Sequence, residues 1–406
     1  MTTPNGWRRT TLGDLGRYLN GRAFKKDEWR PSGRPIIRIQ NLTGSSEVFN
    51  YFQGEVEDRY VVRPGDLLVS WAATLGAYFW QGPEAVLNQH IFKVESNIDP
   101  KFHKYLLDHK LEELIRHTHG SGMVHITRGK FDTLPVVIPP LDEQRRIVDL
   151  LEDHLSRLDA ADAGLRTSLA RSEAMLTSGL WHTTHGLDAA KTVELQSIAE
   201  VRLGRQRSPR NHSGDRMRPY LRAANVGWDE LRLDDVKEMQ FTEAEEQTYR
   251  LEPGDIILTE ASGSPAEVGK SAVYRGAPSE VCFQNTLLRV RCHSADPEFV
   301  QKYLLAEARA GRFMPESRGV GINHLGRTRL AAVEVDVPTP TQQAIAVAAC
   351  RELVDEIGRL QSSIKAQARR SEALRRSLLA AAFSGRLTGA AFDMPDGKVI
   401  EELAGA

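Results

Sequence analysis

The chain has 406 residues, which is enough for two or three domains that each bury a core. Hydrophobic residues make up 41% and charged residues 26%, as in an ordinary soluble protein, and no apolar run approaches the length of a membrane-spanning helix. The formal charge of −1 differs from the strong positive charge of most autonomous DNA-binding domains. The N-terminal residues lack the apolar core of a signal peptide, so we expect a cytoplasmic protein. Cys282, Cys292 and Cys350 show no CxxC spacing, which favours small buried residues over a disulfide framework or a zinc site.

The first part of the chain predicts a domain of short strands, turns and short helices. Residues 35–42 combine β-forming apolar side chains with a turn-forming Asn, which indicates a strand and its exit. Residues 63–66 are Arg-Pro-Gly-Asp, and they predict a turn that leads into a buried strand. We expect a loop at residues 71–76, then another strand and a short helix around residues 105–107.

A long helix is predicted next, at residues 142–186. Leucines fall three, four or seven positions apart from Leu151 to Leu176, which is the pattern of an amphipathic helix. Asp142 can cap the N-terminus, and Gly186 suits the left-handed residue that follows a helix. At 1.5 Å per residue, such a helix would be about 60 Å long.

The second part of the chain repeats the first. The strand signal of residues 35–42 recurs at residues 219–226. The long helix recurs further on, since Gln343 minus Gln144 gives 199 and other pairs in the two helices share this offset. Such a duplication determines the organisation of the chain. We therefore expect a globular domain at residues 1–141, a long helix at 142–186, a second globular domain at 187–340, a second long helix at 341–388 and a tail at 389–406.

The two long helices carry matching apolar stripes with polar breaks at equivalent places. Asp162 and Ser172 interrupt the first stripe, and Gln361 and Ser371 interrupt the second. Neither stripe can stay exposed to water, so each is expected to cover the other. Because the second globular domain must carry the chain back, we predict an antiparallel intramolecular coiled coil. The predicted fold is α+β: two similar α/β domains joined by two long helices, with a pseudo-twofold internal repeat.

Several polar and basic side chains recur at equivalent positions of the two globular domains. Residues of this kind either hold the fold by capping turns or grip phosphates that both halves of a nucleic-acid site present. Both interpretations remain open at the level of the sequence. The shared candidates are Arg38, Asn41, His125, Arg128 and Lys130 in the first domain and Arg222, Asn225, His324, Arg327 and Arg329 in the second.

Signals for catalysis or metal binding are weak. The segment from Gly263 to Ser271 resembles a phosphate-binding loop, but five residues rather than four separate its glycines, and Pro265 removes one amide donor. His182 and His185 have no carboxylate or cysteine at ligand spacing. We expect no catalytic centre, metal or cofactor in this chain, with a nucleotide-binding enzyme as the less favoured alternative.

The order of these signals, present twice, resembles the specificity subunit of type I restriction–modification systems. The resemblance covers about residues 12–387. It rests on the Leu12-Gly13-Asp14-Leu15 opening, the strand exit from Arg38 to Asn41, the Pro64-Gly65-Asp66 turn and the Glu143-Gln144 helix start, each with a counterpart in the second half.

The resemblance implies a non-catalytic subunit that reads a split double-stranded DNA sequence. Each globular domain would be a target recognition domain for one half-site, and the helices would set the unread gap. Two methyltransferase subunits, which bind S-adenosylmethionine, would dock on the chain. Restriction/translocase subunits would supply the cleavage and translocation that depend on ATP and magnesium. The docking candidates are Glu143, Gln144, Gln342 and Gln343, of which Gln342 departs from the family's usual Glu.

Base reading is expected from loop residues that the two domains do not share, because shared residues cannot distinguish two different half-sites. Amide side chains pair with adenine, Lys with guanine and Glu with cytosine. The candidates are Ser70, Trp71, Thr74 and Gln89 in the first domain and Glu260, Ser262, Lys270 and Asn285 in the second. The alternatives are ordinary loop residues at these positions and, for the whole chain, a coiled-coil scaffold that touches no nucleic acid.

Overall fold

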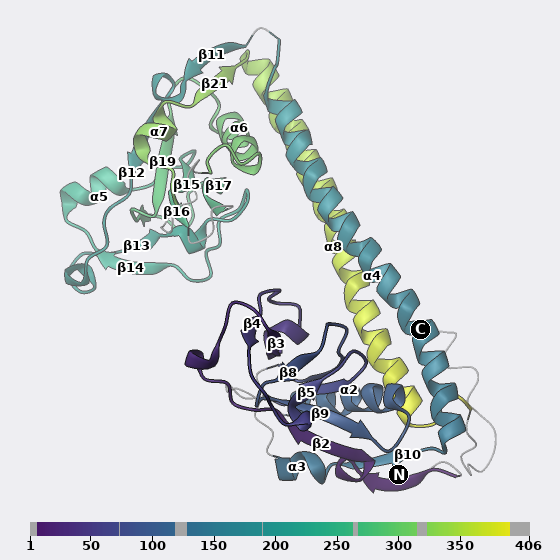
Figure 1. Cartoon of the computed structure of the whole chain (residues 1–406). Coiled ribbons are helices and arrows are strands. Elements are labelled where there is room, and N and C mark those ends of the chain that lie inside the picture. Colours follow the sequence, from purple (N-terminus) through teal and green to yellow (C-terminus); the bar gives the residue numbers. More distant parts are fainter. Residues whose placement is uncertain are drawn as a thin grey trace. The chain divides into compact units, whose positions relative to one another are not determined.

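The computed structural model describes residues 6–72, 74–117, 128–188, 190–262, 267–314 and 323–389. The chain forms two compact units: unit 1 comprises Met1–Gly164 and Gln367–Ala406, and unit 2 comprises Leu165–Ala366. Each unit contains one globular part, one half of the long helix α4 (Leu141–Thr184) and one half of the long helix α8 (Pro340–Phe383) (Figure 1).

Unit 1 is built on two small sheets. The first is antiparallel, with the strand order β2 (Gly16–Asn20), β9 (Ile91–Ser96), β6 (Leu67–Ser70) and β7 (Gly76–Phe79). The second has the order β4 (Asn50–Phe52), β3 (Arg34–Ile37), β8 (Ala85–Leu87) and β5 (Val61–Val62), and its β3 and β8 are parallel. A separate antiparallel pair joins β1 (Arg8–Thr11) to β10 (Pro135–Ile138).

Helices complete the globular part of unit 1. They are α1 (Ile39–Leu42), α2 (Pro100–His117) and α3 (Arg128–Asp132), with 3-10 turns at Leu12–Leu15, Lys26–Glu28 and Asp58–Tyr60. Phe102 and Leu106 of α2 are buried in one core with Val69 of β6 and Phe92 of β9. Helix α2 therefore covers one face of the first sheet.

Unit 2 repeats this arrangement. Its antiparallel sheet has the order β12 (Ala199–Leu203), β19 (Leu287–Cys292), β15 (Ile256–Thr259) and β17 (Ser271–Val273). The second sheet has the order β14 (Lys237–Gln240), β13 (Met217–Leu221) and β18 (Cys282–Phe283), with β13 and β18 parallel. Further pairs join β11 (Lys191–Glu194) to β21 (Glu334–Val337) and β16 (Ala261–Ser262) to β20 (Asn323–His324). The predicted internal repeat is thus confirmed in the order of the strands.

The helices of unit 2 also follow the repeat. They are α5 (Glu243–Tyr249), α6 (Pro297–Arg309) and α7 (Arg327–Ala331), with 3-10 turns at Leu195–Ser197, Pro209–Asn211 and Ala223–Asn225. Phe299 and Leu304 of α6 are buried with Leu258 of β15 and Val290 of β19, as α2 is buried on the sheet of unit 1.

The two Pro-Gly turns have the predicted form. Gly65 and Gly254 adopt φ of +91° and +97°, a region that favours glycine. The carboxylate of the following Asp66 or Asp255 accepts a hydrogen bond from the backbone N–H three residues earlier, at 2.8 and 2.7 Å. Strands β6 and β15, which follow these turns, are buried at every residue.

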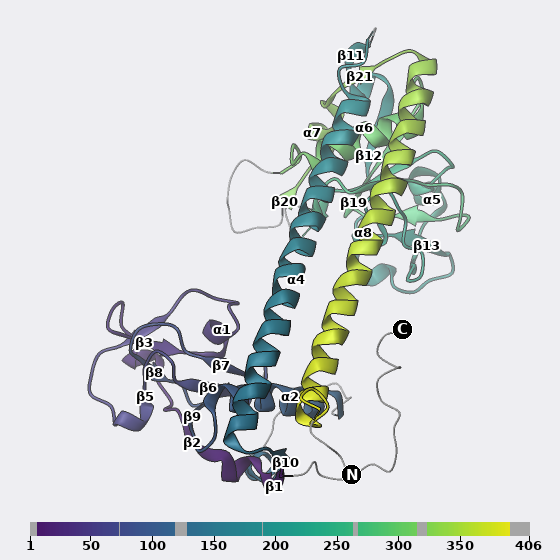
Figure 2. The same cartoon turned by 90° about the vertical axis from the view of Figure 1, so that its right-hand side faces the viewer.

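The long helices pack against each other in an antiparallel direction within each unit (Figures 1 and 2). In unit 1, Leu151 of α4 shares a core with Leu379 of α8. In unit 2, Leu180 of α4 shares a cluster with Cys350 of α8. Two predicted polar breaks also meet, since Gln361 Nε2 donates to Ser172 Oγ at 3.2 Å in unit 2. The predicted antiparallel pairing is confirmed.

The helix ends partly differ from the prediction. Gly186 and Gly385 follow α4 and α8 with φ of +66° and +77°, as expected for C-terminal glycines. The expectation that Asp142 caps the first long helix is wrong, because α4 and α8 each begin one residue before the predicted start, at Leu141 and Pro340. Proline suits the first position of a helix, since it has no N–H to satisfy there. None of the described helices combines the length and hydropathy that a membrane span requires.

Candidate nucleic-acid interface

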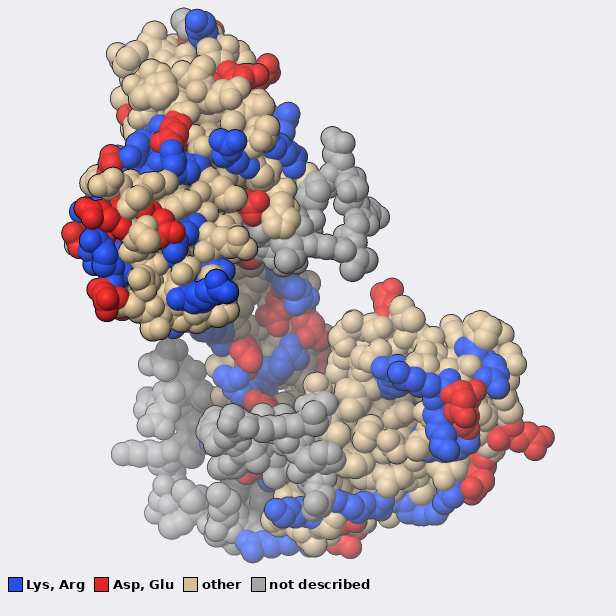
Figure 3. All heavy atoms as spheres, turned by 90° about the vertical axis from the view of Figure 1, so that its left-hand side faces the viewer, with Lys and Arg blue, Asp and Glu red and all other residues tan. Residues whose placement is uncertain are grey.

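Basic and acidic side chains are interspersed on the surface of each unit (Figure 3). Several arginines are neutralised within their own unit. Arg291 binds Asp255 with two bonds of 2.7 and 2.8 Å, and both Arg216 and Arg218 reach Glu246, at 3.0 and 3.1 Å. Such cations are already compensated, so a phosphate contact must come from basic residues that have no acidic partner.

Asn41 and Asn225 hold equivalent turns. Asn41 Oδ1 accepts from the N–H of Arg38 at 3.0 Å, and its Nδ2 donates to two loop carbonyls at 3.1 and 3.0 Å. Asn225 Oδ1 accepts from the N–H of Arg222 at 3.0 Å, and its Nδ2 donates to two loop carbonyls at 2.8 and 3.2 Å. Because both amides use their donors and acceptors inside the domain, we assign them to the fold rather than to DNA phosphates.

The side chains of Arg38 and Arg222 differ in their partners. Arg38 Nη2 donates to Gln40 Oε1 at 2.8 Å, and its guanidinium lies 5.6 Å from the centre of the Trp29 ring. Arg222 Nη2 pairs with Asp235 Oδ2 at 2.5 Å. In the described part of the chain Arg38 has no acidic partner, so only Arg38 keeps an uncompensated charge for a phosphate.

Arg128 and Arg329 serve the fold at helices α3 and α7. Arg128 Nη1 donates to the carbonyl of Tyr18 at 2.7 Å, and its Nε pairs with Asp132 at 3.0 Å. Arg329 donates to three carbonyls in the turn after α6, at 2.9, 3.3 and 3.4 Å. These bonds tie each small helix to its domain, so both arginines act first as structural residues.

Lys130 and Arg327 are different, since both are exposed and neither side chain has an acidic or hydrogen-bonding partner among the described residues. Each unit therefore presents one such cation on its small helix, although the two do not occupy the same position of the repeat. His324 Nδ1 lies 2.9 Å from Glu260 Oε2. His125, the remaining shared candidate, lies outside the described residues.

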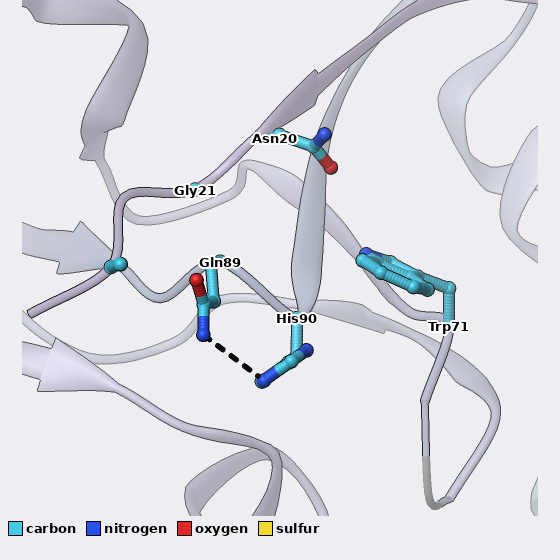
Figure 4. A pocket seen from close by; sticks show the side chains of 6 residues that line it. Asn20, Gly21, Trp71, Gln89 and His90 are labelled. Carbon is cyan, nitrogen blue, oxygen red and sulfur yellow. Dashed lines mark hydrogen bonds between the residues drawn. The ribbon is translucent and has the colours of Figure 1, made fainter. Parts of the chain in front are cut away.

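A pocket of about 380 Å³ opens at the end of strand β2 in unit 1 (Figure 4). Its lining consists of Asn20, Gly21, Ala23, Trp71, Gln89 and His90. None of these described lining residues is Lys, Arg, Asp or Glu. The pocket is therefore suited to hydrogen bonding and stacking with a base edge rather than to binding a phosphate.

Trp71 forms a fixed wall of this pocket. Its ring stacks on the buried Phe92, with the ring centres 5.6 Å apart, and His90 meets it edge-on at 5.8 Å. Gln89 is exposed, and its Nε2 lies 3.3 Å from His90 Nε2. The structure thus brings together two predicted base-reading residues, Trp71 and Gln89, with Asn20 and His90.

Ser70 and Thr74 do not line the pocket. Ser70 is fully buried, and its Oγ donates to the carbonyl of Thr74, so it closes the loop between β6 and β7. The expectation that Ser70 reads a base is corrected, because no part of it is exposed. Thr74 is exposed at the tip of this loop.

The equivalent place in unit 2 carries different chemistry. Glu260 follows β15 as Trp71 follows β6, but it is only 8% exposed. Its carboxylate oxygens Oε2 and Oε1 lie 2.9 and 3.2 Å from His324 Nδ1. Unit 2 therefore presents a carboxylate beside an imidazole where unit 1 presents an indole.

The other candidates of unit 2 are less available. Lys270 Nζ pairs with Glu267 Oε1 at 2.5 Å, and its side chain is 12% exposed, so its charge is compensated. Asn285 is half-buried, and the side chain of Ser262 lies outside the described residues. Strand β17 begins at Ser271, directly after Lys270, whereas a phosphate-binding loop must lead into a helix. This contradicts the nucleotide-binding alternative.

The described residues contain no group of three His, Cys, Asp or Glu side chains that could hold a metal ion. His185 is packed instead between the rings of Trp181 and Tyr303, with centres 3.7 and 3.9 Å away. Its Nε2 lies 2.9 Å from Glu307 Oε1. The histidine is therefore part of an aromatic stack at the end of α4.

Comparisons with known proteins agree with this organisation. Residues 4–169 match the family described as the type I restriction modification DNA specificity domain. The specificity subunit of the type I restriction enzyme EcoKI from Escherichia coli strain K12 is 21% identical over 95% of this chain and 90% of that subunit. The chain is related to the type I restriction specificity subunits.

One further match covers part of the chain, and another, to a solved structure, shows its fold. The EcoBI specificity subunit of Escherichia coli is 29% identical over 171 residues, which are 41% of this chain and 36% of that subunit. A solved chain from work on complex assembly and conformational transition of the type I R-M system has a TM-score of 0.73. It is 17% identical, and the match covers 95% of this chain and 100% of that chain, which shows the fold.

Gln144 and Gln343 are two of the four predicted docking residues, and the structure corrects this expectation because both are buried. They are 3% and 4% exposed. Gln144 Oε1 accepts from the N–H of Asp99 at 3.0 Å, and Gln343 Oε1 accepts from the N–H of Asp296 at 2.9 Å. Each Nε2 also donates to a proline carbonyl five residues earlier, at 2.9 and 2.8 Å. These glutamines join the start of α2 or α6 to the start of a long helix.

The neighbouring pair is more exposed. Gln342 Oε1 accepts from Thr339 Oγ1 at 2.9 Å and from its N–H at 3.1 Å, so Gln342 helps to cap α8. Its Nε2 donates to the carbonyl of Asp188 at 2.9 Å. Glu143 is half-buried, and Arg146 Nη1 lies 3.9 Å from its carboxylate. Of the four residues, Glu143 is the least tied into the fold.

The sequence patterns do not identify Asn20 and His90, but glycines at equivalent positions of the two domains, Gly21 and Gly204, are a signal for this site. A Cβ at Gly21 would lie 2.1 Å from the carbonyl oxygen of Asn88, and a Cβ at Gly204 would lie 2.2 Å from that of Gln284. Only glycine permits this close approach. It places the end of β2 beside the segment before β9, so the residues flanking Gly21 and Asn88 share one pocket.

Proposed function

We propose that this chain is the DNA-reading specificity subunit of a type I restriction–modification complex. Each globular part would read one half of a split double-stranded DNA site. The observation that carries the proposal is a duplicated frame with unlike loops: the strand orders correspond, whereas Trp71 and His90 of unit 1 are replaced by Glu260 and Thr286 in unit 2. Two unlike half-sites require such a combination.

The geometry supports a division of roles. Arg38, Lys130 and Arg327 are the candidates for phosphate contacts, because the described residues give them no acidic partner. Trp71 and Gln89 are the candidates for base reading in the first half-site, with Glu260 in the second. Phosphate contacts would position the chain, and base contacts would specify the sequence.

The chain would act in the cytoplasm without catalytic groups of its own. A partner methyltransferase would bind S-adenosylmethionine and methylate adenine, and restriction/translocase subunits, where present, would use ATP and magnesium. The internal duplication supports two copies of the methyltransferase, because a pseudo-twofold chain presents the same surface twice.

A repeated stripe on the long helices supports this stoichiometry. Its last three positions follow the first by three, four and seven residues, so all four lie on one helix face. All of them are exposed, so no core explains why three of the four are identical in the two helices. The stripe consists of Arg171, Ala174, Met175 and Ser178 in α4 and Arg370, Ala373, Leu374 and Ser377 in α8. We assign methyltransferase docking to this repeated stripe.

Changing Met175 or Leu374 to Glu tests the docking assignment. These side chains are 59% and 51% exposed, so the fold should tolerate the change while a buried contact with the partner is lost. Each single variant should bind one methyltransferase instead of two, measured as the mass of the purified complex. Ile345→Glu is the matched control, because Ile345 is 63% exposed on α8 but has Arg146 as its counterpart. Full occupancy in both single variants would reject the stripe.

The proposed function is tested by mapping methylated adenines across the genome of host cells with and without this gene, co-expressed with the neighbouring methyltransferase. We expect a split motif that appears only when the chain is present. Removing the same number of residues from both long helices should then shorten the unread gap and leave the half-sites unchanged. If methylation by an active methyltransferase never depends on the chain, the scaffold alternative replaces the DNA reader.

A further inference from the structure

The pocket of unit 1 is preformed. Trp71 is held against Phe92, which is 2% exposed, and Gly21 permits the close approach that forms the opposite side. Figure 4 shows Gln89 and Trp71 on two sides of the opening, with His90 between them and Asn20 on strand β2 across from His90. A pocket with fixed walls can select a ligand by the position of its polar atoms, because little has to be rearranged on binding.

The orientation of one amide in this pocket is set by its neighbour. Gln89 Nε2 lies 3.3 Å from His90 Nε2 (Figure 4). A neutral imidazole with its proton on Nδ1 accepts a hydrogen bond at Nε2, so one N–H of the amide is directed to the histidine. The second N–H and the oxygen Oε1 then form the free edge of Gln89 in a fixed order.

A donor beside an acceptor, in a fixed order, matches adenine. In the major groove adenine presents N7 as an acceptor and N6 as a donor, and an amide of Gln or Asn pairs with both atoms. Thymine presents one acceptor and a methyl group instead. Asn20 provides a second exposed amide on the same pocket, without a hydrogen bond to any described residue.

We propose that this pocket reads an adenine in the half-site of the N-terminal domain, an inference that rests on the proposed function. Gln89 pairs with adenine N6 and N7, Asn20 is a further specificity-determining residue, and His90 is the positioning residue that fixes the order of donor and acceptor. Trp71 provides the apolar wall against which the base edge is placed.

The pocket distinguishes the two domains. The repeat places Leu203 at the position of Asn20, Glu260 at that of Trp71 and Thr286 at that of His90. Only the amide at Gln89 has a similar counterpart, Asn285, and no imidazole adjoins it in the sequence. The inferred reading therefore belongs to one half-site, and changes in this pocket should leave the other half-site unaffected.

The test uses the complex of full-length chain and methyltransferase with a duplex that carries the motif mapped for the natural chain. Each adenine of the N-terminal half-site is replaced in turn by 7-deazaadenine, which lacks the N7 acceptor. At one position, the natural complex should bind about tenfold more weakly, because the amide N–H of Gln89 loses its acceptor and one bond of the bidentate contact is broken. The Gln89→Ala complex should bind the unmodified duplex about equally weakly and show no further loss with 7-deazaadenine.

His90→Phe tests the positioning role, because it keeps a ring against Trp71 and removes the acceptor. At the same position, the preference for A·T over T·A should fall by about tenfold, while binding to unrelated duplex stays unchanged. Asn20→Ala should weaken binding to the half-site in the same manner. If 7-deazaadenine weakens binding by the natural complex and by the Gln89→Ala complex equally, the adenine contact lies elsewhere and the proposal fails. If the natural complex does not prefer the mapped duplex, the proposed function fails instead.

Discussion

The globular parts of units 1 and 2 are most alike where side chains point into the fold and least alike where they face the pocket. Asn41 and Asn225 make the same set of hydrogen bonds at equivalent turns. Two residues that approach the pocket of unit 1, Trp71 and His90, have Glu260 and Thr286 as counterparts. A duplicated DNA reader needs this distribution, since the frame is common to both halves and the bases are not.

The comparison also shows what a recurring residue means. Gln144 and Gln343 recur because each satisfies a buried N–H and a buried carbonyl, and a different residue would leave both without a partner. Arg128 and Arg327 recur in register but differ in use, since Arg128 is bound within unit 1 and Arg327 is exposed. Recurrence alone therefore identifies residues that serve the fold more reliably than residues that bind DNA.

The largest expected effect is on stability, from Gln144→Ala or Gln343→Ala. Each change leaves one backbone N–H and one carbonyl unsatisfied in a buried place, at a cost of about 4 kcal/mol. Both variants should lower the free energy of unfolding in urea by similar amounts if the two bonds are truly equivalent. Gln367→Ala, an exposed change on α8, is the control and should alter stability by less than about 0.5 kcal/mol. If one variant loses much of its free energy of unfolding and the other loses none, the two glutamines do not have equivalent roles in the two units.

The next prediction distinguishes the two units by how their stability depends on pH. His103 of α2 is fully buried between Tyr18 Oη at 2.7 Å and Ser96 Oγ at 2.8 Å, and burial lowers its pKa from 6.5 to about 4. Between these pH values only the unfolded chain binds the proton, so stability present above pH 6.5 is lost as the pH falls toward 4. The loss is on the order of 3 kcal/mol.

Urea unfolding at pH 7.5, 5.5 and 4.5 measures this loss. His103→Gln should flatten the dependence, because an amide can bond to both hydroxyls without titrating. Helix α6 has Val300 and Gln301 in the corresponding turn, and neither titrates. An unchanged slope in His103→Gln would assign the acid sensitivity to other groups.

Much of the frame could be predicted from the sequence, because its signals are local and occur twice. The Pro-Gly turns, the leucine stripes and the glycines after the long helices each specify their structure within a few residues. The pocket could not be predicted, since it depends on the approach of Gly21 to Asn88, which are far apart in the sequence. The burial of two polar side chains could not be predicted either. Ser70 is hydrogen-bonded to a loop carbonyl and Gln144 to the start of a helix, so both are satisfied inside the fold.

A smaller effect should appear in the second half-site alone. Glu260→Gln keeps the size of the side chain but replaces a carboxylate beside His324 with an amide. If Glu260 reads a base, preference at one position of the second half-site should change by about tenfold, because each base contact contributes roughly 1–3 kcal/mol. Mapping the methylated motif measures this, and the first half-site serves as the internal control. A change in the first half-site would mean that the two readers are not independent.

The smallest expected effect concerns the two exposed cations, Lys130 and Arg327. A phosphate contact contributes equally for every sequence, so Lys130→Ala and Arg327→Ala should weaken binding of the complex without changing the motif. Each should also reduce the slope of log affinity against log salt by about 0.9, because one fewer counterion is released. Arg329→Ala is the matched control: it breaks hydrogen bonds to the turn after α6 and should lower stability while it leaves the salt slope unchanged. If the salt slope falls for Arg329→Ala and not for Arg327→Ala, the phosphate contact is made by Arg329 and not by Arg327.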